Sequence, residues 1–163
     1  MSRSARRASV VLLASALVVL LAMLRYPGKP PLELPAEQCD RELWRRVYRP
    51  ERLEVVASCT AVEGRVVEVR HESDGDLHVE IDPSTPSVLN LWNAVRRGGR
   101  LVVEVVCHHE STHQDAQAAC AGFHSRVEIP EPGDRIRAIG AYVTDREIGW
   151  KEIHPVTRID RLR

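Results

Sequence analysis

The chain has 163 residues, which is enough for one ordinary domain and a tail but too few for two full cores. Its 23 basic and 23 acidic residues give a formal net charge of zero, so no overall basic charge favours nucleic acid. Aromatic residues make up 4% of the chain, whereas binding of single-stranded nucleic acid usually needs several exposed rings for stacking. We therefore do not expect nucleic acid as a partner.

An apolar segment, residues 8–24, lies near the N-terminus and follows Arg3, Arg6 and Arg7. A helix of this length measures roughly 25 Å, close to the lower limit for spanning a hydrocarbon core. The segment ends without the small residues that signal peptidase prefers and continues into Arg25. We therefore predict that residues 1–25 form an uncleaved signal anchor that binds the membrane, rather than a cleaved signal peptide or a buried soluble helix.

All four cysteines, Cys39, Cys59, Cys107 and Cys120, follow this segment. The arginines before the segment favour an N-terminus inside the cell, which places the cysteines outside the cytoplasm, where an even number of cysteines indicates disulfides. Three pairings are possible. Pairing of sequence neighbours would close loops of about 14 to 21 residues and contribute roughly 3 kcal/mol each. A zinc site is the alternative, but the chain has no C-x-x-C spacing.

Residues 26–35 contain four prolines and a glycine, and we interpret them as a stiff spacer. In residues 36–48, the apolar residues Leu43, Trp44 and Val47 occur at helical spacing, and Pro50 stops the pattern. We predict a short helix within residues 36–58 that packs on the domain that follows, with Trp44 contributing to the core.

From Thr60 the pattern changes to that of strands, which we expect at residues 60–72, 77–82, 100–107, 134–143 and 150–159. Gly64 indicates a bulge or bend in the first strand, and Asp74-Gly75 a tight hairpin turn. Residues 83–97 are predicted to be an irregular connection, and residues 112–119 a short helix between the third and fourth strands. This order predicts a mainly β domain, residues 59–163, that folds as a small five-stranded barrel of OB type.

Two motifs, Asp74-Gly75-Asp76-x-His78 and Gly149-Trp150-x-Glu152-Ile153-His154-Pro155-Val156, accompany the cysteine pattern. Together they resemble an uncharacterised family of secreted or membrane-anchored bacterial OB-fold-like domains, over most of residues 37–160. The resemblance implies the fold and a location outside the cytoplasm. It implies no known activity, so no catalytic residue follows from it.

The sequence His109-Glu110-Ser111-Thr112-His113 has the H-E-x-x-H pattern. On a helix, its two histidines share a face and can bind Zn²⁺, with the glutamate activating a metal-bound water. Here the pattern directly follows a predicted strand, and no suitably spaced third histidine follows it. A solvated loop is therefore favoured over adventitious metal binding at His109 and His113, and over a zinc protease.

A second set of candidate ligand-binding residues combines the first hairpin with the last strand. Trp150, Glu152 and His154 alternate and so share one face of their strand. If they met Asp74, Asp76 and His78, the carboxylates and histidines could bind a divalent metal or transfer protons. The alternative is that these residues only shape the turn, pack and make structural hydrogen bonds.

From these observations we predict a membrane-anchored binding module outside the cytoplasm, whose partner is an envelope protein or a glycan. Secretion after signal cleavage is the alternative location. No cofactor is expected. A zinc-dependent hydrolase that uses histidine and glutamate residues is the second hypothesis for function, and a nucleic-acid-binding OB domain is the third.

Overall fold

The computed structural model describes residues 17–18, 20–21 and 24–163 of the chain. The predicted signal anchor, residues 1–25, falls largely outside these residues. Within the part of the chain that is described, no helix is both long enough and apolar enough to cross a membrane.

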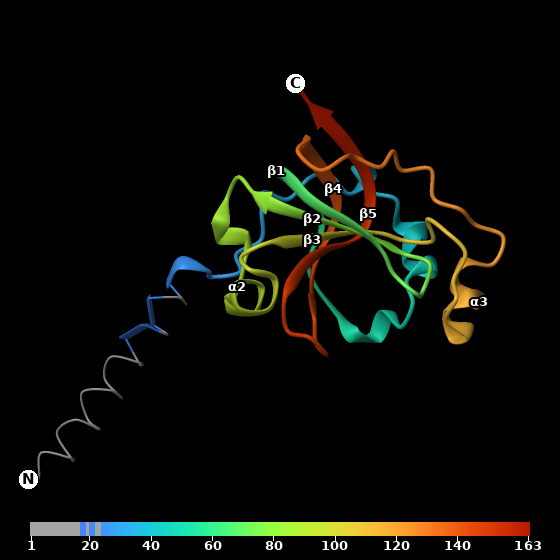
Figure 1. The fold of residues 1–163 in the computed structure, drawn as a ribbon, viewed down its shortest axis with the longest axis horizontal. Helices are drawn as coiled ribbons and strands as arrows, with labels where there is room; N and C mark the ends of the chain where they lie inside the picture. The colour runs from blue at the N-terminus through green and yellow to red at the C-terminus, as the bar shows by residue number, and fades with distance from the viewer. Residues whose placement is uncertain (1–16, 19, 22–23) are drawn as a thin grey trace, which may run out of the picture.

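Five strands form a sheet that closes on itself (Figure 1). Their hydrogen-bonded order is β1-β2-β3-β5-β4, with β4 returning to β1. All neighbours are antiparallel except β3 and β5, which are parallel. The prediction of a mainly β chain with five strands is therefore confirmed. The strands are β1 (Leu53–His71), β2 (Leu77–Pro83), β3 (Leu101–Val105), β4 (Arg135–Asp145) and β5 (Lys151–Leu162).

The first strand is long because it pairs with two neighbours, β4 along most of its length and β2 towards its end. It begins at Leu53, before the predicted start at Thr60, because its pairing with β4 already starts there. Gly64 belongs to both ladders, opposite Pro83 of β2 and Ile136 of β4. A Cβ atom on Gly64 would lie 2.6 Å from the carbonyl oxygen of Asp82, so only glycine allows this approach of the strands.

The helices are short. Residues 36–48, predicted as one helix, instead form two 3-10 helices, Ala36–Gln38 and Arg41–Arg46, and further 3-10 turns are Pro50–Arg52, Pro86–Val88 and Gln114–Ala116. Between β3 and β4, the predicted helix is present as this last turn followed by α3 (Gln117–Cys120). The connection expected to be irregular contains α2 (Leu91–Arg97). Asn90 and Asn93 form a capping box at its start, and Gly98 ends it with φ of 62°.

The sheet has a packed layer on each face. The interior is filled by residues such as Leu77, Val79, Leu101, Val103 and Ile153. A second, smaller apolar cluster lies outside the sheet and includes Leu43 and Val47 of the N-terminal segment, Val106, and Ala141 and Val143 of β4. Trp44 packs against this second cluster while remaining partly exposed. The N-terminal segment therefore covers part of the outer face of the sheet.

Two disulfides join sequence neighbours, Cys39 with Cys59 and Cys107 with Cys120. The first ties the N-terminal segment to β1, and the second ties the end of β3 to α3. The prediction of two disulfides is confirmed, and of the three possible pairings the one between sequence neighbours is present.

We predict that Gly64→Ala destabilises the fold by about 1–3 kcal/mol, because the new methyl group meets backbone that cannot move without separating β1 from β2. Chemical denaturation followed by circular dichroism measures this change. The matched control is Glu63→Ala at the exposed neighbouring position, which should change stability by less than about 0.5 kcal/mol. Equal stability of the two variants would contradict the close approach at Gly64.

Candidate functional site

Histidine and carboxylate side chains meet on the outer face of the sheet where β2, β3 and β5 are neighbours. His78 of β2 lies opposite Glu104 of β3, and Glu152 of β5 lies beside Val102 of β3. Because side chains alternate along a strand, the neighbours of these residues, such as Leu77, Val103 and Ile153, point into the core while His78, Glu104, Glu152 and His154 point outward. The parallel pairing of β3 with β5 therefore brings the two predicted groups together around Glu104.

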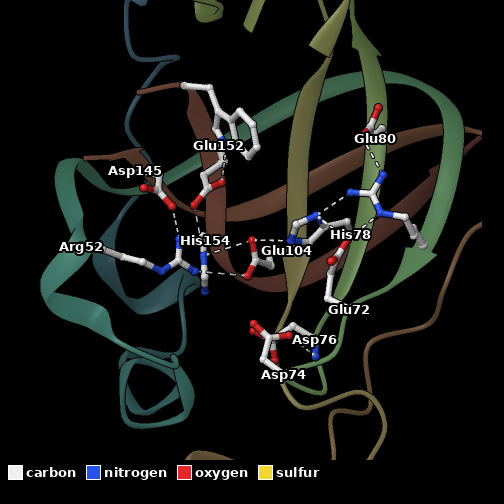
Figure 2. Close-up of polar contacts among 12 residues, drawn as sticks. Arg52, Glu72, Asp74, Asp76, His78, Glu80, Glu104, Asp145, Glu152 and His154 are labelled. Carbon is white, nitrogen blue, oxygen red and sulfur yellow. Dashed lines mark hydrogen bonds and ion pairs between the residues drawn. The ribbon is translucent and has the colours of Figure 1, made fainter. Parts of the chain in front are cut away.

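Glu104 is the centre of the cluster (Figure 2). Its Oε2 atom lies 2.9 Å from Nε2 of His78 and 3.3 Å from Nδ1 of His154. The same Nδ1 atom of His154 lies 3.2 Å from Oε1 of Glu152. The other oxygen of Glu152 accepts a hydrogen bond of 2.7 Å from the indole nitrogen of Trp150. A continuous chain of polar contacts thus connects β2, β3 and β5.

Arg52 extends the cluster towards the N-terminal segment. Its guanidinium forms an ion pair with Asp145 at the end of β4 and lies 3.7 Å from Oε1 of Glu104. In Figure 2, Arg52 reaches Glu104 from the side opposite His78. Glu104 is therefore surrounded by three groups that carry or can carry positive charge.

Asp76 completes the cluster from the turn before β2. Its Oδ1 atom accepts a 2.7 Å hydrogen bond from the backbone nitrogen of Cys107, just beyond β3. Ligand atoms of Asp76, Glu104 and His154 all lie within 4.8 Å of one another. These three residues are 1%, 2% and 0% exposed, and each has a buried atom without a hydrogen-bond partner: Asp76 Oδ2, Glu104 Oε1 and His154 Nε2. Unsatisfied atoms of this kind are rare in folded proteins, and here three of them belong to one cluster.

Proximity changes the protonation of these groups. Burial, together with the carboxylates of Glu104 and Asp74, raises the pKa of Asp76 to about 8. Burial alone would lower the pKa of His154, but the carboxylates of Glu104, Glu152 and Asp76 outweigh it and raise this pKa to about 9. Burial would raise the pKa of Glu104, but His154, His78 and Arg52 hold it well below its usual range. Near neutral pH, Glu104 is therefore ionised while Asp76 and His154 hold protons.

The pKa of His78 is raised for the same reason as that of His154. Burial alone would lower its pKa, but the nearby carboxylates of Glu104 and Glu72 outweigh it and raise this pKa. His78 also contacts Glu72 directly, at 3.2 Å from Nδ1 to Oε1. The contact with Glu72 connects the cluster to the loop between β1 and β2.

A pocket of about 240 Å³ opens beside the cluster. Its wall includes Glu104 and His78, and its rim is formed by the loop between β1 and β2, the loop between β4 and β5, and the N-terminal segment around Tyr48. A larger groove of about 710 Å³ lies elsewhere, along residues 122–128 and β5, but its charged residues, such as Arg158 and Asp160, lie at the surface and pair with each other. The smaller pocket is the one with converging chemical groups.

The other predicted site residues have separate roles. Asp74 lines the pocket, and its Oδ1 atom accepts a hydrogen bond from the backbone nitrogen of Asp76. Trp150 is buried, and Arg97 stacks on its ring at 4.0 Å from the centroid. The H-E-x-x-H residues do not form a helix. His113 lies beside the ring of Tyr48 at 5.5 Å between centroids, whereas His109 lies beside His71.

Glu104 and Arg52 belong to the cluster but were not predicted from the sequence. Glu104 is the only charged residue of a strand that otherwise reads Leu-Val-Val-x-Val, and a charge inside so apolar a strand is a signal that something must pair with it. Arg52 gives no such signal, because it follows Arg49, Pro50 and Glu51, a polar segment of the kind that is usually exposed.

No protein-family model matches the chain. None of the curated proteins matches it with significant similarity. The resemblance to secreted or anchored bacterial OB-fold-like domains therefore stays a prediction.

We predict that the metal-free protein, kept in a chelator, becomes less stable as the pH rises from 5 to 9. Asp76 and His154 both bind protons more tightly in the folded state. The stability that Asp76 contributes is complete below its unfolded pKa and is lost as the pH rises towards about 8, and that of His154 is lost towards about 9. Thermal unfolding at a series of pH values measures this decline.

Asp76→Asn keeps the acceptor for the Cys107 nitrogen but removes the carboxyl group, so its decline should begin only near the unfolded histidine pKa of about 6.5, where His154 and His78 start to lose protons in the unfolded chain. The control is Asp82→Asn, at an exposed position of β2, which should decline as the unchanged protein does. An equal decline in the Asp76→Asn variant would contradict the assignment.

Proposed function

We propose that this chain is a binding module of OB type that acts outside the cytoplasm and binds a divalent metal ion at Asp76, Glu104 and His154. The observation that carries the proposal is the group of three buried atoms without hydrogen-bond partners, one on each of these residues, next to an open pocket. The three residues each have a ligand atom within 4.8 Å of the others, so one cation could bind all three.

The position of the pocket supports the OB interpretation. In OB folds, ligands bind to the face of strands 2 and 3, between the loop joining strands 1 and 2 and the loop joining strands 4 and 5. The pocket here is lined by His78 of β2, Glu104 of β3, Asp74 from the first of these loops and Ile148 from the second. The closed order β1-β2-β3-β5-β4 and the helix-containing connection between β3 and β4 fit the same fold.

The charges of the pocket favour a cation over a phosphate. Both arginines in its wall are already paired with acidic residues, Arg49 with Glu147 and Arg52 with Asp145. Acidic residues outnumber them, since the lining also contains Glu72, Asp74, Glu104, Asp145, Glu147 and Glu152. A nucleic-acid backbone would meet net negative charge here, which opposes binding.

The chemistry of the three ligands suits a transition metal better than Ca²⁺ or Mg²⁺. Two carboxylates and one imidazole form a mixed set of oxygen and nitrogen ligands, which Zn²⁺ and related ions accept. The hydrogen bond from Cys107 to Oδ1 of Asp76 fixes that carboxylate and leaves Oδ2 free for an ion. Because the three ligands are buried, an ion would reach them from the pocket that Glu104 lines.

The location outside the cytoplasm, with residues 1–25 as an anchor, is part of the same proposal. Two disulfides support it, because disulfides persist mainly in oxidising compartments. The Pro-rich residues 26–35, predicted to be a stiff spacer, instead lie against the domain, because the backbone nitrogens of Gly28, Lys29 and Leu34 donate to the backbone oxygens of Leu89, Ser87 and Cys59.

We predict that the full chain, dialysed against Zn²⁺ and then against metal-free buffer, retains one more ion per chain than Asp76→Asn does. Elemental analysis gives the metal-to-protein ratio. The matched control is Asp74→Asn, two residues away in the same turn, which keeps the turn hydrogen bond and should retain the ion. Parallel dialysis against Mn²⁺ and Ca²⁺ tests the choice of metal.

A second variant distinguishes loss of a metal ligand from loss of the fold. Glu104→Gln removes the central charge, and circular dichroism with intact disulfides shows whether it folds. Retention of the same amount of Zn²⁺ by Asp76→Asn and by a folded Glu104→Gln would overturn the proposed site.

A further inference from the structure

We propose that His71, His108 and His109 form a second metal site, at the surface, that binds a divalent transition-metal ion through imidazole nitrogens. The site shares no residue with the buried cluster and does not depend on the function proposed for that cluster.

The three imidazoles come from two segments that are distant in sequence. His71 ends β1, and His108 and His109 follow β3. One ring nitrogen from each of the three lies within 4.8 Å of the others. The Nδ1 atoms of His71 and His109 are 3.3 Å apart, and their rings meet edge to face at 4.6 Å between centroids. Three converging nitrogens provide the ligand set of a protein site whose remaining position is open to water.

The hydrogen bonds around the site favour free nitrogen lone pairs. His109 donates a 2.9 Å hydrogen bond from Nε2 to the backbone oxygen of Glu72, which fixes the tautomer that leaves Nδ1 available. Histidines that bind metals commonly donate their second nitrogen to a carbonyl in this way. Nδ1 of His108 is buried and has no hydrogen-bond partner. An ion at this site could bind the free Nδ1 of His109 and would give Nδ1 of His108 a partner if that nitrogen is the ligand atom.

The backbone holds the histidines in place before any ion binds. The nitrogens of His108 and His109 both donate to the backbone oxygen of Gly75 in the hairpin turn, at 2.8 and 3.0 Å. Gly75 has φ of 98°, and a Cβ atom there would lie 2.9 Å from the backbone oxygen of His109, so glycine is required for this contact. The disulfide of Cys107 fixes the loop from the other side. Such preorganisation reduces the conformational cost of binding.

The ligand type limits the choice of metal. Imidazole suits Zn²⁺, Cu²⁺ and Ni²⁺, whereas Mg²⁺ and Ca²⁺ prefer oxygen. The site also changes the interpretation of the H-E-x-x-H pattern. His109 lies with His71 and His108, and His113 does not belong to this group. His113 is directed to Tyr48 and serves as a natural control.

The test uses the full chain without a histidine tag. In the Asp76→Asn background, which removes the buried site, calorimetric titration with Cu²⁺ should show one site whose electron paramagnetic resonance spectrum has splitting from imidazole nitrogens, and Zn²⁺ but not Mg²⁺ should compete. His71→Asn, at an exposed position, should weaken this site by more than about tenfold, because loss of a ligand costs at least as much as loss of an outer partner. His113→Asn should leave it unchanged.

Asp76→Asn separates the two sites, since it should keep the nitrogen splitting while losing the buried Zn²⁺. Unchanged Cu²⁺ affinity and spectrum in both His71→Asn and His109→Asn would overturn the surface site. An equal loss in His113→Asn would also overturn it, because binding would then not require these three histidines.

Discussion

The carboxylate of Glu104 is the charge on which the outer face of this molecule depends. It is 2% exposed, and an ionised carboxylate is stable at such a position only when it is paired. Its partners come from three other segments: Arg52 precedes β1, His78 lies in β2 and His154 in β5. Leaving such a charge unpaired typically costs about 3–5 kcal/mol, so the pairs around Glu104 fix how these segments pack.

The sequence predicts the strands well because their periodicity and turns are local signals. Asp74-Gly75 marks the first hairpin, and β-branched residues mark β3. It also suggests that Asp76, His78, Glu152 and His154 could meet, but not how. They meet through Glu104 because β3 pairs in parallel with β5. The residues of the two strands do not indicate this pairing, because the strands are far apart in the chain. The capping box of α2 was readable from Asn90, Asn93 and Gly98, but the prolines before it obscured the signal.

The spacing of the histidines after β3 does not predict which of them lie together. A four-residue spacing implies a shared face only on a helix, and here the chain forms turns because its backbone nitrogens bond to the hairpin between β1 and β2. Thr112 and His113 donate to the oxygen of Ser73, as His108 and His109 do to that of Gly75. The tertiary contact replaces the helical hydrogen bonds, and it brings His71 next to His109 in place of His113.

The hairpin turn therefore connects the two histidine-containing clusters. Asp76 uses Oδ1 to hold the nitrogen of Cys107, the residue before His108, while its Oδ2 has no hydrogen-bond partner and the residue lies beside Glu104 and His154. Near neutral pH, Asp76 and His154 each hold a proton, so a divalent ion that replaces both protons leaves the total charge of the buried cluster unchanged. The charge balance around Glu104 that stabilises the folded chain is thus compatible with an empty site and with an occupied one.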